Sequence, residues 1–279
     1  MARLAPAREI NKGAKRLNLG EARARRRAHA QLLSSSPWCI YCGGCQPADT
    51  IEHMPPVMMF IRKQRPKGLE FPSCRECNNG TSKSDLVASL LGRLSVHPSA
   101  GDEAAETIKL FSSVRNNVQG LLEEMHLDPA EEKLACKGLL LQEGDGALRA
   151  NGPLVTQHML VFGAKLGFAL HYEALQTVVP PTGGVQSLWF SNAQAARGEI
   201  PKDLFSLLPA TRQTLKQGRR EVSDQFQYAW AITPERQHAL FYATFHRSFA
   251  VAVVSAMDRT AFIEKHADRH PVVLPGAFR

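Results

Sequence analysis

The sequence has no hydrophobic run long enough to cross a membrane. Its longest apolar stretches, Gly167–Leu170 and Phe249–Val254, stop far short of the roughly 20 residues that a spanning helix needs. The first 30 residues also lack the apolar core of a secretory signal. These absences favour a cytoplasmic location, with an Arg-rich, acid-poor organellar transit peptide as the alternative.

Acidic side chains are scarce near the N-terminus, where only Glu9 and Glu21 oppose nine lysines and arginines within residues 1–30. This segment therefore holds +7 of the formal net charge of +8, and the rest of the chain is close to neutral. Such an arm can neutralise the phosphates of a nucleic acid and add sequence-independent affinity. The alternative is a solvated tail or a charged helix face. The predicted nucleic-acid contacts in the arm are Arg23, Arg25, Arg26 and Arg27.

Cysteine is also scarce, with six residues in a chain of 279. A disulfide framework is the alternative for any cysteine cluster, but a chain of this length without a secretory signal has no need of one. Four of the six form two C-x-x-C pairs, the spacing with which two tight turns supply ligands to zinc. We expect a closed, structural zinc site at Cys39, Cys42, Cys74 and Cys77. Cys45 is close enough in sequence to compete as a ligand, and Cys136 is expected to be a small buried side chain.

The segment between the two pairs contains an adjacent acid and imidazole, Glu52 and His53, and the amide Asn78 directly follows the last cysteine. Hydrolysis of a phosphodiester needs a base for water and a cation for the growing negative charge. His53 suits the base, since its ordinary pKa lies near 6.5. Glu52 and Asn78 offer the oxygen ligands that Mg²⁺ or Mn²⁺ prefers. Neighbours on a regular strand point to opposite faces, so a bend is required if Glu52 and His53 are to share one centre.

Three stretches together resemble the HNH, or His-Me finger, endonucleases built on a zinc-bound treble clef. They are CIYCG at 39–43, TIEHMPP at 50–56 and FPSCRECNN at 71–79. The resemblance implies a ββα-metal module over residues 37–96, in which Glu52 and Asn78 bind the catalytic cation and His53 is the general base. It also implies products with 5′-phosphate and 3′-hydroxyl ends. The sequence departs from the family in having Glu52 where Asp is usual, and in lacking a clear counterpart of the middle asparagine near Gly68.

Further basic residues surround this segment. In the family a basic residue often follows the second cysteine pair, a place that Lys83 takes here, and other cations crowd the loop between the pairs. Each cation of this loop either contacts a phosphate or lies on the solvated surface, and both interpretations stay open. Arg75 is expected to face a phosphate or a thiolate. The predicted contacts outside the arm are Arg62, Lys63, Arg65, Lys67, Arg75 and Lys83.

Several side chains have a second interpretation. His53 is alternatively a structural histidine or a zinc ligand, and Asn79 replaces Asn78 if the turn shifts by one residue. The other histidines with apolar or aromatic neighbours, His158, His171 and His246, are expected to lie in the core.

The length of the chain favours two domains. We expect a basic arm at 1–36 with a helix at 21–33, the metal module at 37–96, a linker at 97–102, and a separate α+β domain at 104–279. Periodicity predicts helices at 84–94 with Ser84 as N-cap, at 104–125 and at 153–175, and a short helix or a turn at 131–137. Strands are predicted at 187–191, 225–232, 238–245 and 249–255. The predicted fold class is α+β, with the C-terminal domain serving for positioning, oligomerisation or regulation.

The sequence therefore predicts a metal-dependent HNH endonuclease that hydrolyses phosphodiester bonds in DNA. One active centre cuts one strand per visit, so double-strand cleavage requires a homodimer or two encounters. The leading alternative is a non-catalytic, zinc-stapled nucleic-acid-binding or interaction module in which Glu52, His53 and Asn78 are remnants. An enzyme of the same fold that acts on RNA is the third possibility.

Overall fold

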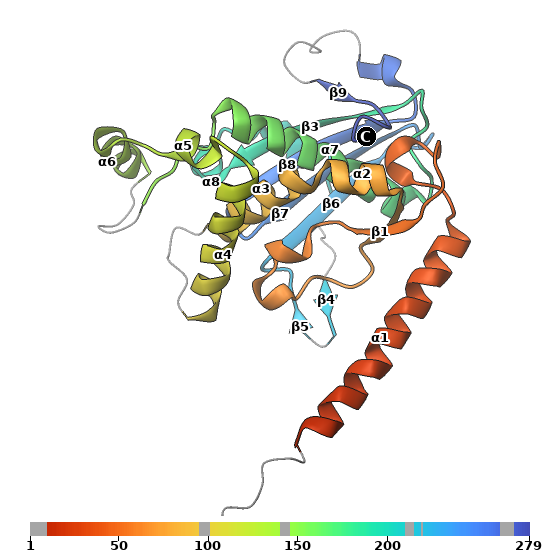
Figure 1. Ribbon diagram of the computed structural model, residues 1–279. Helices are drawn as coiled ribbons and strands as arrows, with labels where there is room; N and C mark the ends of the chain where they lie inside the picture. The colour runs from red at the N-terminus through yellow and green to blue at the C-terminus, as the bar shows by residue number, and fades with distance from the viewer. Residues whose placement is uncertain (1–9, 95–100, 140–145, 210–214, 219, 263–270) are drawn as a thin grey trace, which may run out of the picture.

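A computed structural model describes residues 10–94, 101–139, 146–209, 215–218, 220–262 and 271–279 (Figure 1). It confirms a mixture of helices and strands. The helices are α1 (Ile10–Ser35), α2 (Arg75–Gly80), α3 (Ser82–Arg93), α4 (Asp102–Asn117), α5 (Leu121–Met125), α6 (Pro129–Gly138), α7 (Pro153–Leu175), α8 (Asn192–Ala196) and α9 (Lys202–Ser206). The strands are β1 (Thr50–His53), β2 (Glu70–Ser73), β3 (Gly184–Ser191), β4 (Lys216–Gln217), β5 (Arg220–Glu221), β6 (Phe226–Ile232), β7 (His238–Phe245), β8 (Phe249–Ala256) and β9 (Val272–Val273). Short 3₁₀ turns are η1 (Ile40–Cys42), η2 (Val57–Met59), η3 (Ile61–Lys63) and η4 (Arg259–Phe262).

The largest sheet has five antiparallel strands in the order β6-β7-β8-β3-β9. Its side chains alternate between two faces, as the pleat of a strand requires. One face turns Phe241, Phe245 and Val251 into the main core. The other face presents Phe190, Tyr242 and two alanines to a smaller cluster, which is covered by apolar side chains from the segment around α9.

Helix α7 is the centre of the molecule. It packs against β3 and β8 on one side and against α3 on the other, and its residues are buried nearly all the way round. Gly163 and Gly167 allow the close approach to the sheet: a Cβ at Gly163 would lie 2.9 Å from the Cβ of Ser187, and one at Gly167 would clash with Val253. Lys165 stands two residues from each glycine, so it points away from the sheet toward the cysteine-containing segment.

The segment with the two cysteine pairs forms a ββα unit on the free side of α7. β1 and β2 pair as a short antiparallel ribbon, and α2 and α3 follow β2 directly. Buried residues of 37–96 and of 104–279, predicted as separate domains, belong to one hydrophobic cluster. The two predicted units are therefore continuous through their core.

The N-terminal helix is longer than the predicted 21–33 and projects away from the rest of the described chain (Figure 1). Only its last turns approach β1 and β2. None of the described helices combines the length and apolar character needed to cross a membrane.

Several predicted boundaries are confirmed and others are corrected. The helix at 153–175 and the strand at 238–245 end where the sequence predicted. The predicted helix at 104–125 is broken into α4 and α5: Val118 leaves the helical conformation with φ of −128°, and Gly120 takes a left-handed one with φ of 79°. Helix α3 begins at Ser82 with Thr81 at the N-cap, so Ser84 is not the cap. The predicted linker at 97–102 lies largely outside the described residues.

Candidate metal centre and hydrolytic site

The four cysteines of the two pairs come together as predicted. Cys39 and Cys42 flank the η1 turn, Cys74 precedes α2 and Cys77 lies in its first turn. All four are buried, and their sulfur atoms lie within 4.8 Å of one another. A tetrahedral zinc ion with Zn–S bonds of about 2.3 Å needs sulfur atoms roughly 3.8 Å apart, so the group fits zinc. Cys45 is exposed and Cys136 is half-buried, and neither belongs to this group.

The C-terminal segment covers the cysteine group. The amide of Gly276 donates to the carbonyl of Tyr41 at 2.9 Å, and the buried Phe278 ring packs edge-on against Tyr41 and Phe168. A hydrogen bond with the Cys42 sulfur raises the pKa of Arg279 above its ordinary value. A guanidinium here offsets the negative charge of a tetrathiolate centre. No short stretch of sequence predicts this contact, because it joins residues that are far apart along the chain.

Glu52 lies in a buried ionic cluster. Its Oε2 atom is 2.8 Å from Nζ of Lys165, and the same ammonium is 2.7 Å from Oδ2 of Asp85 on α3. Burial raises the pKa values of both carboxyl groups, and the lysine opposes this shift. The Lys165 side chain is fully buried and lies 6.0 Å from the centre of the Tyr41 ring. Lys165 was not predicted from the sequence. It is the single charged residue within the otherwise apolar stretch 159–170, and this was a usable signal because buried lysines are almost always paired.

His53 points to the opposite face of β1, which keeps a regular pairing with β2. Its backbone amide donates to Oε1 of Glu52 at 2.8 Å, so the two residues are linked through the main chain. The His53 ring is half-buried and faces Glu70 of β2, with Nε2 3.6 Å from Oε1. Burial, followed by the charge of Arg65, lowers the pKa of His53. The imidazole therefore favours its neutral form.

Two further residues complete the surroundings of His53. His29 of α1 stands edge-on to the His53 ring at a centroid distance of 6.0 Å, and its Nε2 lies 3.7 Å from Oε2 of Glu70. Arg65 is buried, binds Oε1 of Glu70 at 3.2 Å and donates to the Leu69 carbonyl at 2.8 Å. Neither His29 nor Glu70 was predicted. His29 precedes the motif by more than 20 residues, and Glu70 is brought opposite His53 only by strand pairing.

Asn78 is turned toward β1, where its Nδ2 donates to Oγ1 of Thr50 at 3.0 Å. Glu52 therefore pairs with Lys165 and Asn78 with Thr50, whereas His53 faces Glu70. The regular strand places His53 on the opposite face of β1 from Thr50 and Glu52, because consecutive side chains on a strand alternate between its faces.

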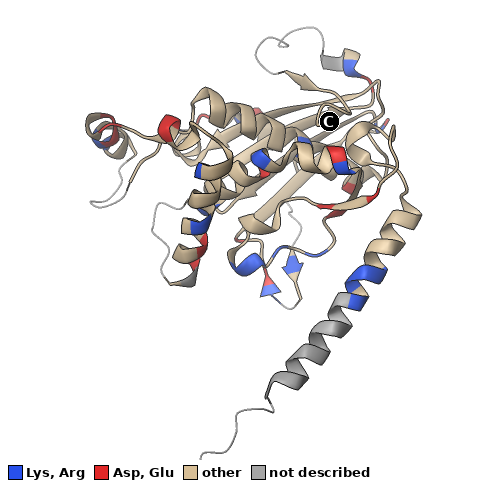
Figure 2. Cartoon of the chain, in the orientation of Figure 1, with Lys and Arg blue, Asp and Glu red and all other residues tan. Residues whose placement is uncertain are grey.

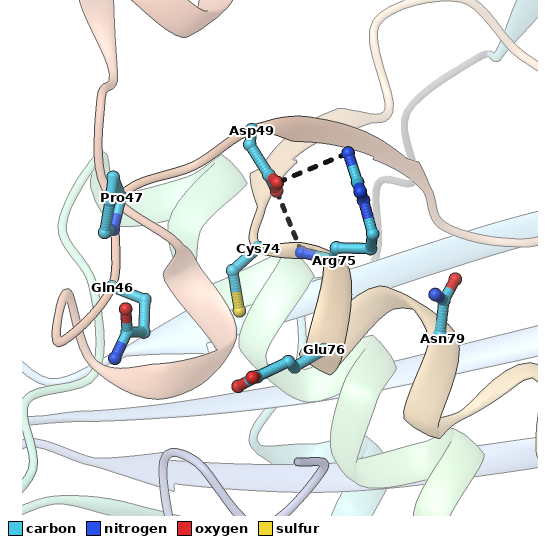
Figure 3. A pocket seen from close by; sticks show the side chains of 7 residues that line it. All are labelled: Gln46, Pro47, Asp49, Cys74, Arg75, Glu76 and Asn79. Atoms are coloured by element: carbon cyan, nitrogen blue, oxygen red, sulfur yellow. Dashed lines mark hydrogen bonds and ion pairs between the residues drawn. The ribbon is translucent and has the colours of Figure 1, made fainter.

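Asn79, the alternative to Asn78, lines an open pocket of about 450 Å³ beside Cys74 (Figure 3). Arg75 also lies here, with its amide donating to Asp49 at 2.9 Å and its guanidinium 3.7 Å from the same carboxylate. The Arg75 side chain is about three-quarters exposed. Neither His53 nor Glu70 lines the pocket, so it is distinct from the surroundings of His53.

The remaining predicted phosphate contacts are on the surface. The predicted contacts on α1, on η3 and the loop that follows it, and near the start of α3 all have exposed side chains. They are Arg23, Arg25, Arg26, Arg27, Arg62, Lys63, Lys67 and Lys83. Figure 2 shows basic residues on the described part of α1 and around η3, β4 and β5, on the lower side of that view. Two cations that were not predicted as contacts, Lys216 and Arg220, add exposed positive charge beside this loop.

The loop between β1 and β2 is held by residues far along the chain rather than by a middle asparagine. Gln225 accepts a hydrogen bond from the Ile61 amide at 2.8 Å, and His246 Nε2 donates to the Met59 carbonyl at 2.9 Å. Arg62 and Lys63 adopt positive φ angles of 53° and 56°, a conformation uncommon for residues with a side chain. The C-terminal region therefore shapes the loop beside His53.

Of the histidines expected in the core, only His171 is fully buried, with Nδ1 2.8 Å from the Ser255 hydroxyl. His158 and His246 are half-buried, and His158 lies 3.0 Å from the Ser84 hydroxyl.

Comparison of the chain with protein-family models, curated proteins and solved structures found no match. Function is therefore argued from the site itself.

Proposed function

We propose that this protein is a zinc-stabilised, metal-dependent endonuclease of the HNH type that hydrolyses phosphodiester bonds in DNA. The observation that supports this best is the position of His53. It lies at the end of the first strand of a ββα unit that also carries the buried group of four cysteines, and its half-buried ring faces a carboxylate and a second imidazole. A structural zinc ion on the four cysteines would hold this unit together.

His53 is the group that activates water by taking its proton, and if it held a cation instead, that cation would supply the activation. The water oxygen then bonds to phosphorus and the bond to the 3′ oxygen breaks, giving a 5′-phosphate and, after protonation by solvent, a 3′-hydroxyl. Glu70 is the carboxylate on the same face as His53, since Glu52 is engaged by Lys165. A catalytic Mg²⁺ or Mn²⁺ on Glu52 and Asn78 requires that Glu52 leave Lys165, whereas Asn78 uses Nδ2 in its bond to Thr50 and keeps its Oδ1 atom for a cation.

The surrounding charge supports a polyanionic substrate. Arg25 lies one helical turn before His29 on the same face of α1, and its charge contributes to the lowered pKa of His53. Exposed cations on η3 and on the β4–β5 hairpin lie on the side toward which α1 projects (Figure 2). Each such cation that meets a phosphate adds affinity without reading sequence. DNA is the proposed partner, and RNA is the alternative substrate that the same surface accepts.

One observation favours a different function. The Glu52 carboxylate is neutralised by a buried lysine, so the acidic residue expected to hold the catalytic cation is already paired. This arrangement suits a non-catalytic, zinc-stapled nucleic-acid-binding module. Binding would then survive the loss of His53.

The deciding experiment incubates the full chain with supercoiled plasmid and with structured RNA, with and without Mg²⁺, Mn²⁺ or Zn²⁺. We expect nicking of DNA by the wild type and a loss of at least about 100-fold in His53→Ala, the range for removal of a general base. His126→Ala, which removes an exposed imidazole on another face, is the control. If the wild type cuts no nucleic acid with any of these metals, the proposed nuclease function is rejected. Retained DNA binding would then support the non-catalytic binding module.

A further inference from the structure

We infer that His29, His53 and Glu70 form a second metal site, distinct from the four cysteines, that takes a divalent transition-metal ion such as zinc. The inference rests on the proposed function only for the role of the bound ion. The three residues come from α1, β1 and β2, and their ligand atoms lie within 4.8 Å of one another. Neither His29 nor Glu70 was predicted to hold a metal ion.

The distances suit shared coordination better than direct hydrogen bonding. Nε2 of His53 lies 3.6 Å from Oε1 of Glu70, and Nε2 of His29 lies 3.7 Å from Oε2. Both separations exceed the range of a good hydrogen bond. Two ligands of a tetrahedral zinc ion, with bonds of about 2.0–2.2 Å, are separated by about 3.4 Å. A small closure of the three side chains is therefore sufficient to coordinate an ion.

The state of His29 is the second observation. Its Nε2 atom is enclosed and has no hydrogen-bond partner among the residues that the structure describes. A buried polar atom without a partner is costly, and such atoms in native proteins call for a specific explanation. A metal ion beside Glu70 satisfies this nitrogen and directs it toward the same point as His53.

The donor set identifies the class of ion. Two imidazoles and one carboxylate suit borderline transition metals, whereas Mg²⁺ and Ca²⁺ prefer oxygen ligands. Three protein ligands also leave a position open for water or for a phosphate oxygen, as in catalytic rather than structural zinc sites. Arg65 donates to Oε1 of Glu70 and so orients this carboxylate, as supporting groups around metal ligands commonly do.

Coordination by His29, which lies in the last two turns of α1, would tie this helix to the hairpin. The arginines of α1 would thereby be held beside the open coordination position. Metal binding and positioning of the basic arm become one event. This links the arm to the hydrolytic centre in a way that the motif alone does not require.

The test counts metal on the full chain. After saturation with Zn²⁺ and removal of the excess, the wild type should hold two ions, and His29→Ala and Glu70→Gln should each hold one. His126→Ala should keep two. Cobalt substitution identifies the ion that is lost, because only the cysteine site gives thiolate charge-transfer absorption, and this band should persist in both variants as a check on folding.

One zinc ion per wild-type chain, or two ions in both variants, overturns the metal site. The first result needs no variant, so misfolding of a variant does not protect the inference. The nuclease assay is read separately. Two ions without cleavage support the metal site and remove the proposed function, whereas one ion with cleavage overturns the site and leaves His53 acting directly as the base.

Discussion

The ammonium of Lys165 lies 2.8 Å from the carboxylate of Glu52, and the ion pair joins two elements that are far apart in the sequence. One residue lies on the central helix and the other on the first strand of the ββα unit. The lysine occupies the position next to Glu52 where the family resemblance places a catalytic cation. It gives Glu52 a structural role, and the His53 amide, which donates to the same carboxylate, is fixed as a result.

Loss of Lys165 should destabilise the fold strongly. In Lys165→Met two buried carboxylates lose their shared cation, and removal of one partner from a buried ion pair costs about 3–5 kcal/mol. Urea unfolding measures the change in the free energy of unfolding. Lys109→Met, on the exposed side of α4, should change it by no more than about 0.5 kcal/mol. Equal stabilities of the two variants would contradict the ionic role of Lys165.

Stability should fall as the pH drops below about 6.5, in part because of His171. Burial lowers the pKa of this imidazole to about 4 from an ordinary value of 6.5. Between these values the unfolded chain binds a proton that the folded chain does not, so the free energy of unfolding rises with pH, by roughly 3 kcal/mol across the window. Thermal or urea unfolding from pH 4 to 7 should show a shallower dependence in His171→Gln. Parallel curves would show that His171 does not contribute.

Neutralising the arm should weaken DNA binding and reduce its salt dependence. Each phosphate contact contributes about −0.9 to the slope of log K against log salt for duplex DNA. Replacement of the four arm arginines Arg23, Arg25, Arg26 and Arg27 by glutamine should therefore make the slope less negative by up to about 4. The same number of exposed cations replaced on α4 and α6, namely Lys109, Arg115, Lys133 and Lys137, serves as the control and should leave the slope unchanged. A larger effect in the control variant would place the DNA elsewhere.

Removing a cysteine ligand should cost the structural metal and the order of the hairpin. Cys42→Ser should lose the cobalt-thiolate absorption of the wild type and, because metal binding is coupled to folding, the near-UV circular dichroism of the buried aromatic side chains. Cys45→Ser, three residues later and exposed, is the matched control and should retain both signals. Loss of the thiolate band in the control would make Cys45 a ligand in place of one of the four.

The sequence predicted what depends on local pattern. The bounds of α7 and β7 followed from apolar periodicity and turn residues, and the cysteine group followed from spacing alone. The site around His53 was harder to predict from the sequence, because strand pairing brings Glu70 opposite His53 and packing of α1 brings His29 to both. The pairing of Glu52 with Lys165 depends in turn on the glycines that set the approach of α7 to the sheet. Such contacts follow from tertiary packing, which no short window of sequence contains.

The buried pairing of Glu52 and Asp85 with Lys165 also sets an order of events during synthesis. A chain leaves the ribosome from its N-terminus, so zinc can bind as soon as Cys77 has emerged. At that stage the two carboxylates still lack their cation, and the segment that covers the cysteines has not been made. The nascent metal unit must therefore keep these carboxylates in contact with water until α7 arrives. The part of the molecule that emerges early is completed only when the later parts dock against it.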